Sequence, residues 1–158
     1  MLTTQTANVH IRWMTRAELP YVLDIERRSF PAHAWGEEAF LSELRKRTVI
    51  GMAAVREERV LGYVIYELHG DRMDVLNFAV HPFYRGQGVG SQMIGKLKAK
   101  LHSHRRGAIR LDAREQSLPF QKFLRHHEFR AVRVVRRHFD DTGEDAFRFE
   151  FRDEGEAQ

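Results

Sequence analysis

The sequence predicts a single α/β domain whose sheet is mixed, mostly antiparallel, with a central parallel crossover. Short apolar, β-branched runs joined by two or three polar residues are typical of antiparallel hairpins. Elsewhere a strand pattern, a glycine-rich loop, a helical pattern and a further strand follow one another, and strands joined in this way run parallel through a right-handed crossover. The length of 158 residues fits one domain, and the sequence contains no internal repeat or linker.

The first elements are an alternating strand and two helices. The strand covers 9–14, and Thr15 and Glu18 have the spacing of a capping box at the start of a helix that ends near Ser29. After a loop, 36–47 is a second helical segment. The residues expected to face the core are Leu19, Val22, Leu23, Ile25, Phe40, Leu41 and Leu44.

Three apolar strands come next, over 48–56, 59–68 and 73–80. Their joints, Glu-Glu and His-Gly-Asp, are short enough for hairpin turns. A helix then begins after the glycine loop. Its apolar residues recur at helical spacing and are Val89, Met93, Ile94, Leu97 and Leu101.

The last elements are a strand, a helix and two strands. The strand covers 108–113, and the helix follows Ser117 as N-cap, with Pro119 in its first turn. Alternating strands are expected within 129–139 and 145–151. We therefore expect a domain over 1–152 and a flexible tail over 153–158.

Composition excludes several classes of protein. The absence of cysteine rules out disulfides, a thiol nucleophile and cysteine-rich zinc sites. The sequence contains neither a membrane-spanning run of about 20 apolar residues nor a signal peptide, so we expect a cytoplasmic protein. From Arg85 to Arg137 there are 14 Lys and Arg residues and three acidic ones. Such a basic half attracts phosphate groups, either of a nucleic acid or of a phosphate-rich cofactor.

The stretch "VHPFYRGQGVGSQMI", over 80–94, has glycines at 86, 88 and 90. A dinucleotide fingerprint would need glycine at 91, which is Ser, and the Gly-Lys-Ser/Thr end of a P-loop is absent. A merely tight turn is one alternative. The other is a cradle of backbone amides at the start of a helix, which would bind a pyrophosphate, with Arg85 adding a guanidinium group.

These residues carry a family resemblance that covers nearly the whole chain. Arg-Gly-x-Gly-x-Gly after a strand ending in "NFAVHP" resembles the acetyl-CoA loop of the GCN5-related N-acetyltransferase (GNAT) superfamily. The stretch "IERRSFPAHAWGEEAF" resembles a segment of the RimI-type protein N-terminal (ribosomal-protein alanine) acetyltransferases, and "GEDAFRFEF" resembles their closing strand. The resemblance implies the GNAT fold.

The resemblance also implies which residues hold acetyl-CoA. The backbone of the strand from Asn77 to Val80 would pair with the pantetheine arm, and a backbone amide near Phe78 to Val80 would serve as an oxyanion donor. The acetyl group would lie where the strands around 76–80 and 108–113 separate. The expected cofactor-binding residues are Phe78, Ala79, Val80, Arg85, Gly86, Gln87, Gly88, Val89, Gly90, Ser91 and Ser117.

Asp112 is the expected catalytic residue. In the RimI-type pattern Leu-Glu-Val-Arg the glutamate is the base, and this chain has Leu-Asp-Ala-Arg. Aspartate is one methylene shorter, so it would act directly or through a water molecule to accept the amine's proton. The alternative is that Asp112 only pairs with Arg110 or Arg114. Asp74 and His138 are weaker candidates for the base.

The leaving-group step departs from the family pattern. The usual tyrosine is Leu124, and the usual glycine before the next strand is Glu128. A thiolate can leave without help because thiols are fairly acidic. Otherwise the proton could come from His126, His127 or Tyr84.

We therefore expect an acetyl-CoA-dependent N-acetyltransferase whose acceptor is a protein N-terminal α-amine, such as that of a ribosomal protein. The alternatives are a lysine or small-molecule acetyltransferase, a catalytically silent acyl-CoA-binding domain, and a ribosome- or RNA-binding protein. The pair His102 and His104 lacks a third ligand, so no metal is expected. Neither membrane association nor direct nucleic-acid binding is expected, and the oligomeric state stays open.

Overall fold

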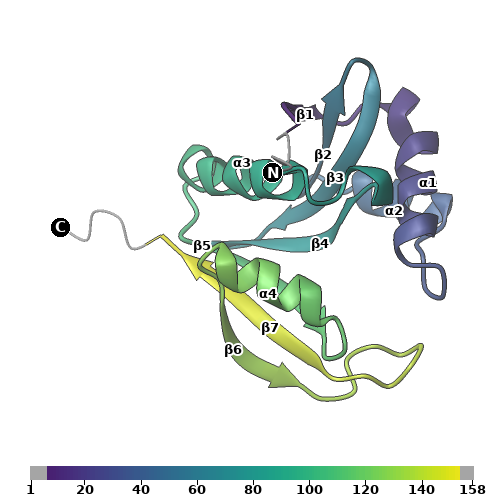
Figure 1. Ribbon diagram of the computed structural model, residues 1–158. Coiled ribbons are helices and arrows are strands. Elements are labelled where there is room, and N and C mark those ends of the chain that lie inside the picture. The colour runs from purple at the N-terminus through teal and green to yellow at the C-terminus, as the bar shows by residue number, and fades with distance from the viewer. Residues whose placement is uncertain (1–6, 154–158) are drawn as a thin grey trace, which may run out of the picture. The chain divides into compact units, whose positions relative to one another are not determined.

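The computed structural model describes residues 7–153 and has the predicted α/β architecture (Figure 1). A seven-stranded mixed sheet has the strand order β1-β2-β3-β4-β5-β7-β6. The strands are β1 His10–Trp13, β2 Val49–Arg56, β3 Arg59–Leu68, β4 Arg72–Val80, β5 Ala108–Arg114, β6 Arg130–Val135 and β7 Ala146–Arg152. The helices are α1 Leu19–Ser29, α2 Glu37–Leu44, α3 Val89–Ser103 and α4 Leu118–His126, with short 3₁₀ turns at Arg16–Glu18 and Pro82–Tyr84.

The predicted crossover is confirmed. Strands β4 and β5 are parallel, and Arg72–Asp74 pair with Ala108–Arg110. Strand β1 is antiparallel to β2, β2 to β3, β5 to β7 and β6 to β7. The glycine loop and helix α3 therefore lie in the connection between the parallel strands β4 and β5.

The two-residue joint between β2 and β3 is a hairpin turn, as predicted. Arg56 pairs with Arg59, which leaves Glu57 and Glu58 at the tip. Both have positive φ, 48° and 66°. A two-residue turn in which both residues have positive φ matches the right-handed twist of the flanking strands, although glycine or asparagine is the usual residue there.

The chain groups into two compact units. The first comprises the chain up to Glu67 together with Leu76–Lys96, and the second comprises Leu68–Val75 and the chain from Leu97 onward.

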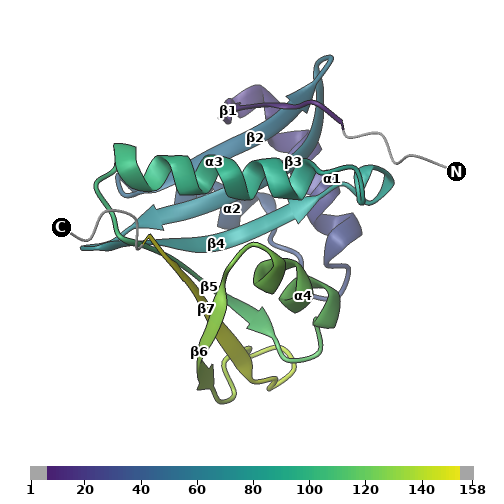
Figure 2. The same ribbon diagram turned by 60° about the vertical axis from the view of Figure 1, so that its left-hand side comes forward.

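In the first unit, helices cover both faces of the strands. Helices α1 and α2 lie behind β2–β4 and α3 lies in front of them (Figure 2). The core beneath α1 and α2 includes Val22, Ile25, Phe40, Tyr63 and Ile65, all at most 1% exposed. The predicted apolar face of α3 is also buried, including Val89, Met93 and Ile94.

A buried carboxylate joins four segments of the first unit. Glu26 on α1 is 1% exposed. It accepts hydrogen bonds from the backbone amide of Trp35 (2.8 Å), from Nδ2 of Asn77 (2.8 Å) and from the hydroxyl of Tyr63. Burial, together with the Glu26 carboxylate, raises the pKa of Tyr63, so its hydroxyl stays protonated and donates.

In the second unit, α4 lies against the sheet formed by β5 and β7 (Figure 1). Ile109, Leu111 and Phe149 are buried on these strands, as are Leu124 on α4 and Phe129 just after it. Edge strand β6 is almost fully exposed. The opposite face of β5 and β7 carries charged side chains, because alternate residues of a strand point to opposite faces.

Of the expected tail over 153–158, only Asp153 lies within the described residues, and its amide donates to the carbonyl of Gly107 (3.0 Å).

The described helices include none that is long and apolar enough to cross a membrane. Between residues 7 and 153 there is also no group of three or more His, Asp or Glu side chains arranged to hold a metal ion.

We predict that Glu26→Gln lowers the free energy of unfolding by about 1–3 kcal/mol. The glutamine NH₂ group would replace one of the two accepting oxygens and would face donors instead of accepting from them. Asp24→Asn is the matched control on the same helix. Its partner is Arg28, at 2.9 Å, and both side chains are exposed, so the loss should be below about 0.5 kcal/mol. Chemical denaturation measures both. Equal losses would show that Glu26 has no special role.

Candidate functional site

Two of the three glycines of the loop have a backbone conformation that favours glycine. Gly86 and Gly88 have positive φ, 77° and 81°, a region that side chains disfavour. Gly90 is the second residue of α3, whose first turn is closed by the amide of Gln92 donating to the carbonyl of Gly88 (3.1 Å). Left-handed residues at alternate positions turn successive amides into a concave surface that favours anions.

The space over the loop can take a ligand. A Cβ atom added at Gly86 would meet no atom within 4 Å. The loop also leads directly into the N-terminus of α3, where the helix dipole favours negative charge. These two features fit a pyrophosphate such as that of acetyl-CoA.

The N-terminal segment secures this loop. The amide of Ala7 donates to the carbonyl of Gln87 (2.9 Å). Gln92 on α3 donates to the carbonyl of Ala7 (2.5 Å) and accepts from the amide of Val9 (3.3 Å). Sequence reasoning missed Gln92, and the available signal was only a polar residue beside the apolar helix positions Met93 and Ile94.

Two hydrogen bonds within the first unit hold the side chain of Arg85. Its Nε donates to the carbonyl of Val80 (3.0 Å), and its Nη2 donates to the hydroxyl of Ser29 (3.0 Å). These bonds fix the exit of β4 against the end of α1. The expected guanidinium fork toward a phosphate therefore has two of its donors already in use.

The end of β4 offers fewer amides than expected. The amide of Phe78 donates to Oδ1 of Asn77 (3.0 Å), whose Nδ2 is in turn held by Glu26. Phe78 is thus not suited to be the oxyanion donor, and Ala79 and Val80 remain the proposed ones.

His81 directly follows β4. Burial, and then the charge of Arg28, lower the pKa of its ring, and its Nδ1 accepts from the amide of Phe83 (3.1 Å).

In the second unit, Asp112 is engaged on both carboxylate oxygens. Arg148 donates from Nε to Oδ1 (2.9 Å) and from Nη2 to Oδ2 (3.1 Å). Nε2 of His138 lies 3.2 Å from Oδ2. The hydrogen bonds that Arg148 donates to Asp112 raise the pKa of Arg148 above its usual value. Asp112, His138 and Arg148 form the cluster that we call the Asp112 triad.

The expectation that Asp112 would pair with Arg110 or Arg114 is wrong. Arg110 pairs with Glu150 (3.3 Å) and Arg114 with Asp141 (2.9 Å). The reason is strand register, because Asp112 on β5 lies directly opposite Arg148 on β7. Opposite residues of an antiparallel pair have Cβ atoms about 5 Å apart, closer than second neighbours on one strand.

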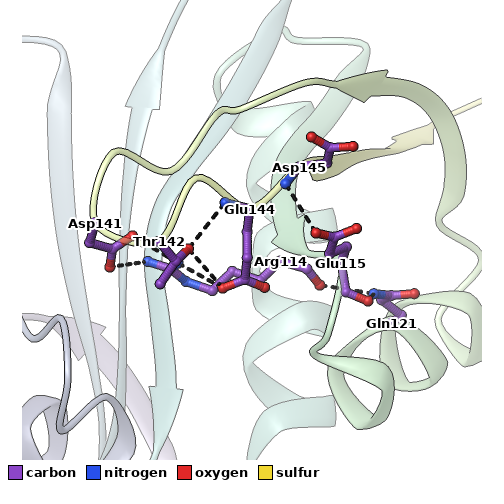
Figure 3. Close-up of polar contacts among 7 residues, drawn as sticks. All are labelled: Arg114, Glu115, Gln121, Asp141, Thr142, Glu144 and Asp145. Carbon is purple, nitrogen blue, oxygen red and sulfur yellow. Dashed lines mark hydrogen bonds and ion pairs between the residues drawn. The ribbon is translucent and has the colours of Figure 1, made fainter.

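Arg114 fastens the loop between β6 and β7, as Figure 3 shows. It donates to both oxygens of Asp141 and to Glu144 (3.2 Å), and its guanidinium lies 4.0 Å from the ring centroid of Phe139. Beside it, the amide of Asp145 donates to Glu115 (3.4 Å). This loop therefore has a defined position relative to the end of β5.

The same loop carries His138. On one side of it the amide of Arg137 donates to Oδ1 of Asp145 (2.9 Å), and on the other the amide of Phe139 donates to the carbonyl of Glu144 (3.2 Å). The histidine is thus anchored through both neighbours, and its ring meets that of Phe139 edge-on at 4.9 Å.

The residues considered for the leaving-group step have other contacts. Leu124 is fully buried in the core under α4. Ser117 occupies the N-cap position, but its side chain makes no capping bond. The hydroxyl of Tyr84 accepts from Arg59 (3.3 Å), and burial lowers the pKa of His127. None of these contacts assigns the proton donor.

We predict that Gly90→Val weakens acetyl-CoA binding at least about tenfold, because a branched side chain would stand where a phosphate approaches the helix start. Gly86 and Gly88 are poor test sites, since their positive φ would strain any other residue. Gly95→Val is the control on the same helix, where an added Cβ meets nothing within 4 Å. Calorimetric titration that gives equal affinities for the two variants would refute the cradle.

Comparisons with known proteins agree with this architecture. Residues 15–129 match the family described as "Acetyltransferase (GNAT) family". A Bacillus subtilis (strain 168) protein named as a candidate [ribosomal protein bS18]-alanine N-acetyltransferase is 23% identical over 137 residues, which cover 86% of this chain and 90% of that one.

Solved structures show the same fold. The ribosomal-protein-S18-alanine N-acetyltransferase of Escherichia coli has a TM-score of 0.82 at 21% identity, covering 96% of this chain and 99% of its own. A GNAT family acetyltransferase from Elizabethkingia anophelis, solved with acetyl-CoA bound, has a TM-score of 0.77 at 16% identity, covering 92% and 98%. The chain therefore belongs to the GNAT family of acetyltransferases, enzymes that use acetyl-CoA.

Proposed function

We propose that this enzyme transfers the acetyl group of acetyl-CoA to the N-terminal α-amine of a protein, such as a ribosomal protein in the cytoplasm. The observation that carries the proposal is the segment between α1 and α2, where Glu26 holds the amide of Trp35 (2.8 Å). Trp35 packs edge-on against Phe40 at 5.1 Å. This aromatic wall is the part of the chain that resembles the RimI-type enzymes, and the names of the two ribosomal-protein acetyltransferase relatives support the same acceptor.

The difficulty of the proton transfer favours an α-amine over lysine. An α-amine has a pKa near 8 and lysine one near 10.4. At pH 7 about one α-amine in ten is neutral, against fewer than one lysine in a thousand. Reaching the neutral form costs about 1.4 kcal/mol for the α-amine and about 4.6 kcal/mol for lysine. A single carboxylate already paired with Arg148 suits the easier task.

The residues of the first unit are proposed to bind the cofactor. Acetyl-CoA supplies the acetyl group as a thioester. The loop amides from Gly86 to Gly90, with Gln87, Val89 and Ser91, would hold its pyrophosphate. The backbone of β4 from Asn77 to Val80 would orient the pantetheine arm. Ser117, in the second unit, is proposed to contact the cofactor on the resemblance alone.

Asp112 is proposed to supply the carboxylate on which deprotonation of the amine depends. It lies on β5, the strand after the loop helix, and the resemblance to the RimI-type pattern matches it with the glutamate of that pattern. Its side chain is 19% exposed, so solvent or an acceptor can reach it. Deprotonation of this kind accelerates a reaction by about 10²–10⁴-fold.

Paired peptides test the acceptor. One peptide has a free N-terminus and blocked lysines, and the other has a blocked N-terminus and free lysines. We expect acetylation of the first peptide at a rate at least about tenfold higher at pH 7, in line with the difference in neutral amine. Preferential acetylation of the lysine peptide, or of a free polyamine, would move the enzyme to another acceptor class.

We predict that Asp112→Asn lowers kcat by about 10²-fold while acetyl-CoA affinity is retained. The matched control is Glu150→Gln on β7, which removes a buried carboxylate from its pairs with Arg110 (3.3 Å) and Arg152 (2.5 Å). Glu150→Gln should lower the melting temperature but leave kcat within a few-fold. Steady-state kinetics that show wild-type kcat for Asp112→Asn would leave Asp112 a purely structural ion-pair residue.

A further inference from the structure

We propose that His138, oriented by Asp112, is the group that first accepts the proton of the acceptor amine. The inference rests on the proposed function and refines it. Asp112 then acts as a positioning residue, through an imidazole rather than directly or through a water molecule.

The geometry of Asp112 argues against direct proton uptake by its carboxylate. Oδ1 accepts from Nε of Arg148, Oδ2 accepts from Nη2 of Arg148, and Nε2 of His138 lies 3.2 Å from Oδ2. A proton on either oxygen would remove the negative charge of the carboxylate and so weaken its contacts with Arg148 and His138. Charge-assisted bidentate pairs are among the stronger hydrogen bonds in proteins, so this loss is costly.

The geometry of His138 is the one that a proton acceptor needs. Its Nε2 lies 3.2 Å from Oδ2 of Asp112, and we assign the hydrogen of the neutral ring to this nitrogen because it is the one beside the carboxylate. Nδ1 then keeps its lone pair, and within residues 7–153 it has no hydrogen-bond partner. The side chain is 36% exposed, so an amine can reach it. A carboxylate that fixes the tautomer of a histidine and stabilises its protonated form is a known device of acid–base catalysis.

The surrounding charges come from all the elements packed near the ring. Arg148 on β7 lies opposite Asp112 on one side and opposite Arg133 of β6 on the other. The next rung of the same sheet face pairs Arg110 of β5 with Glu150 of β7. The remaining charged neighbours are Arg137, adjacent in sequence, Arg114, which contacts Phe139, and Asp74, which acts on Arg148.

The reaction balances with this assignment. The ammonium group of the acceptor loses one proton to Nδ1 of His138, and the imidazolium is stabilised by Asp112. The neutral nitrogen forms a bond to the acetyl carbon as the carbon–sulfur bond breaks, and the sulfur leaves with the electron pair. The second proton on nitrogen neutralises the departing thiolate, and His138 releases its proton to solvent.

This arrangement gives a physical reason for the aspartate at this position. A carboxylate that is one methylene shorter reaches less far from β5. The imidazole of His138, supplied by the loop that Arg114 fastens, extends that reach while Asp112 keeps the charge. The two residues together can then do what a longer carboxylate does alone.

The test is the pH dependence of kcat and KM for His138→Gln with the free N-terminal peptide. We expect kcat at pH 7 to fall by about 10²-fold with KM for the peptide unchanged. At pH 9 part of kcat should return, because the amine then arrives already neutral. His102→Gln is the control, since it removes a similar pair, with Nε2 3.0 Å from Oδ2 of Asp153, on an exposed histidine. It should leave the profile unchanged.

A double variant and a resonance measurement complete the test. Because Asp112 and His138 act as one unit, Asp112→Asn combined with His138→Gln should be no slower than the slower single variant. If His138→Gln does not fold, nitrogen-15 spectra of the wild-type histidine rings decide, and we expect the Nε2–H tautomer of His138 at pH 8. An Nδ1–H tautomer, or a His138→Gln profile that is parallel to wild type at every pH, overturns the inference. Absence of acetylation by the wild type would instead overturn the proposed function.

Discussion

The buried carboxylate of Glu26 is the constraint on which the first unit depends. It is 1% exposed and draws donors from the loop after α1, from β3 and from β4. If any of these segments moved away, a polar oxygen would be left unsatisfied in the interior, which is costly. One of the donors, Asn77, also accepts a hydrogen bond from the amide of Phe78 through its Oδ1. The position of the aromatic wall formed by Trp35 and Phe40 and that of the strand before the glycine loop are thus set by the same side chain.

In the second unit the decisive constraint is strand register. The antiparallel pairing of β5 with β7 puts Arg148 opposite Asp112, and the loop after β6 is fastened to the end of β5 by Arg114. Together they bring His138 to the carboxylate of Asp112. A carboxylate bound by an arginine and a histidine is a better partner for an imidazole than a proton acceptor in its own right.

Much of the fold follows from the sequence, because hydrophobic period and turn spacing are local signals. The hairpin at Glu57, the crossover into α3 and the buried face of that helix were all predictable in this way. The partners of Asp112 and Gln92 were not, because these contacts join residues far apart in the chain and depend on register and on packing. Glu128 shows a mixed case. Its φ of 71° lies in the left-handed region that favours glycine, which is the residue that the family resemblance implies there, although a glutamate gives no sign of this conformation.

We propose that this GNAT enzyme acetylates protein N-termini. The most direct measurement is to incubate the purified enzyme with acetyl-CoA and a mixture of unmodified ribosomal proteins, and to locate new acetyl groups by tandem mass spectrometry. We expect acetyl groups on the α-amines of one or a few proteins, with lysines unmodified. Acetylation spread over lysine side chains, or none at all with acetyl-CoA bound, would contradict it.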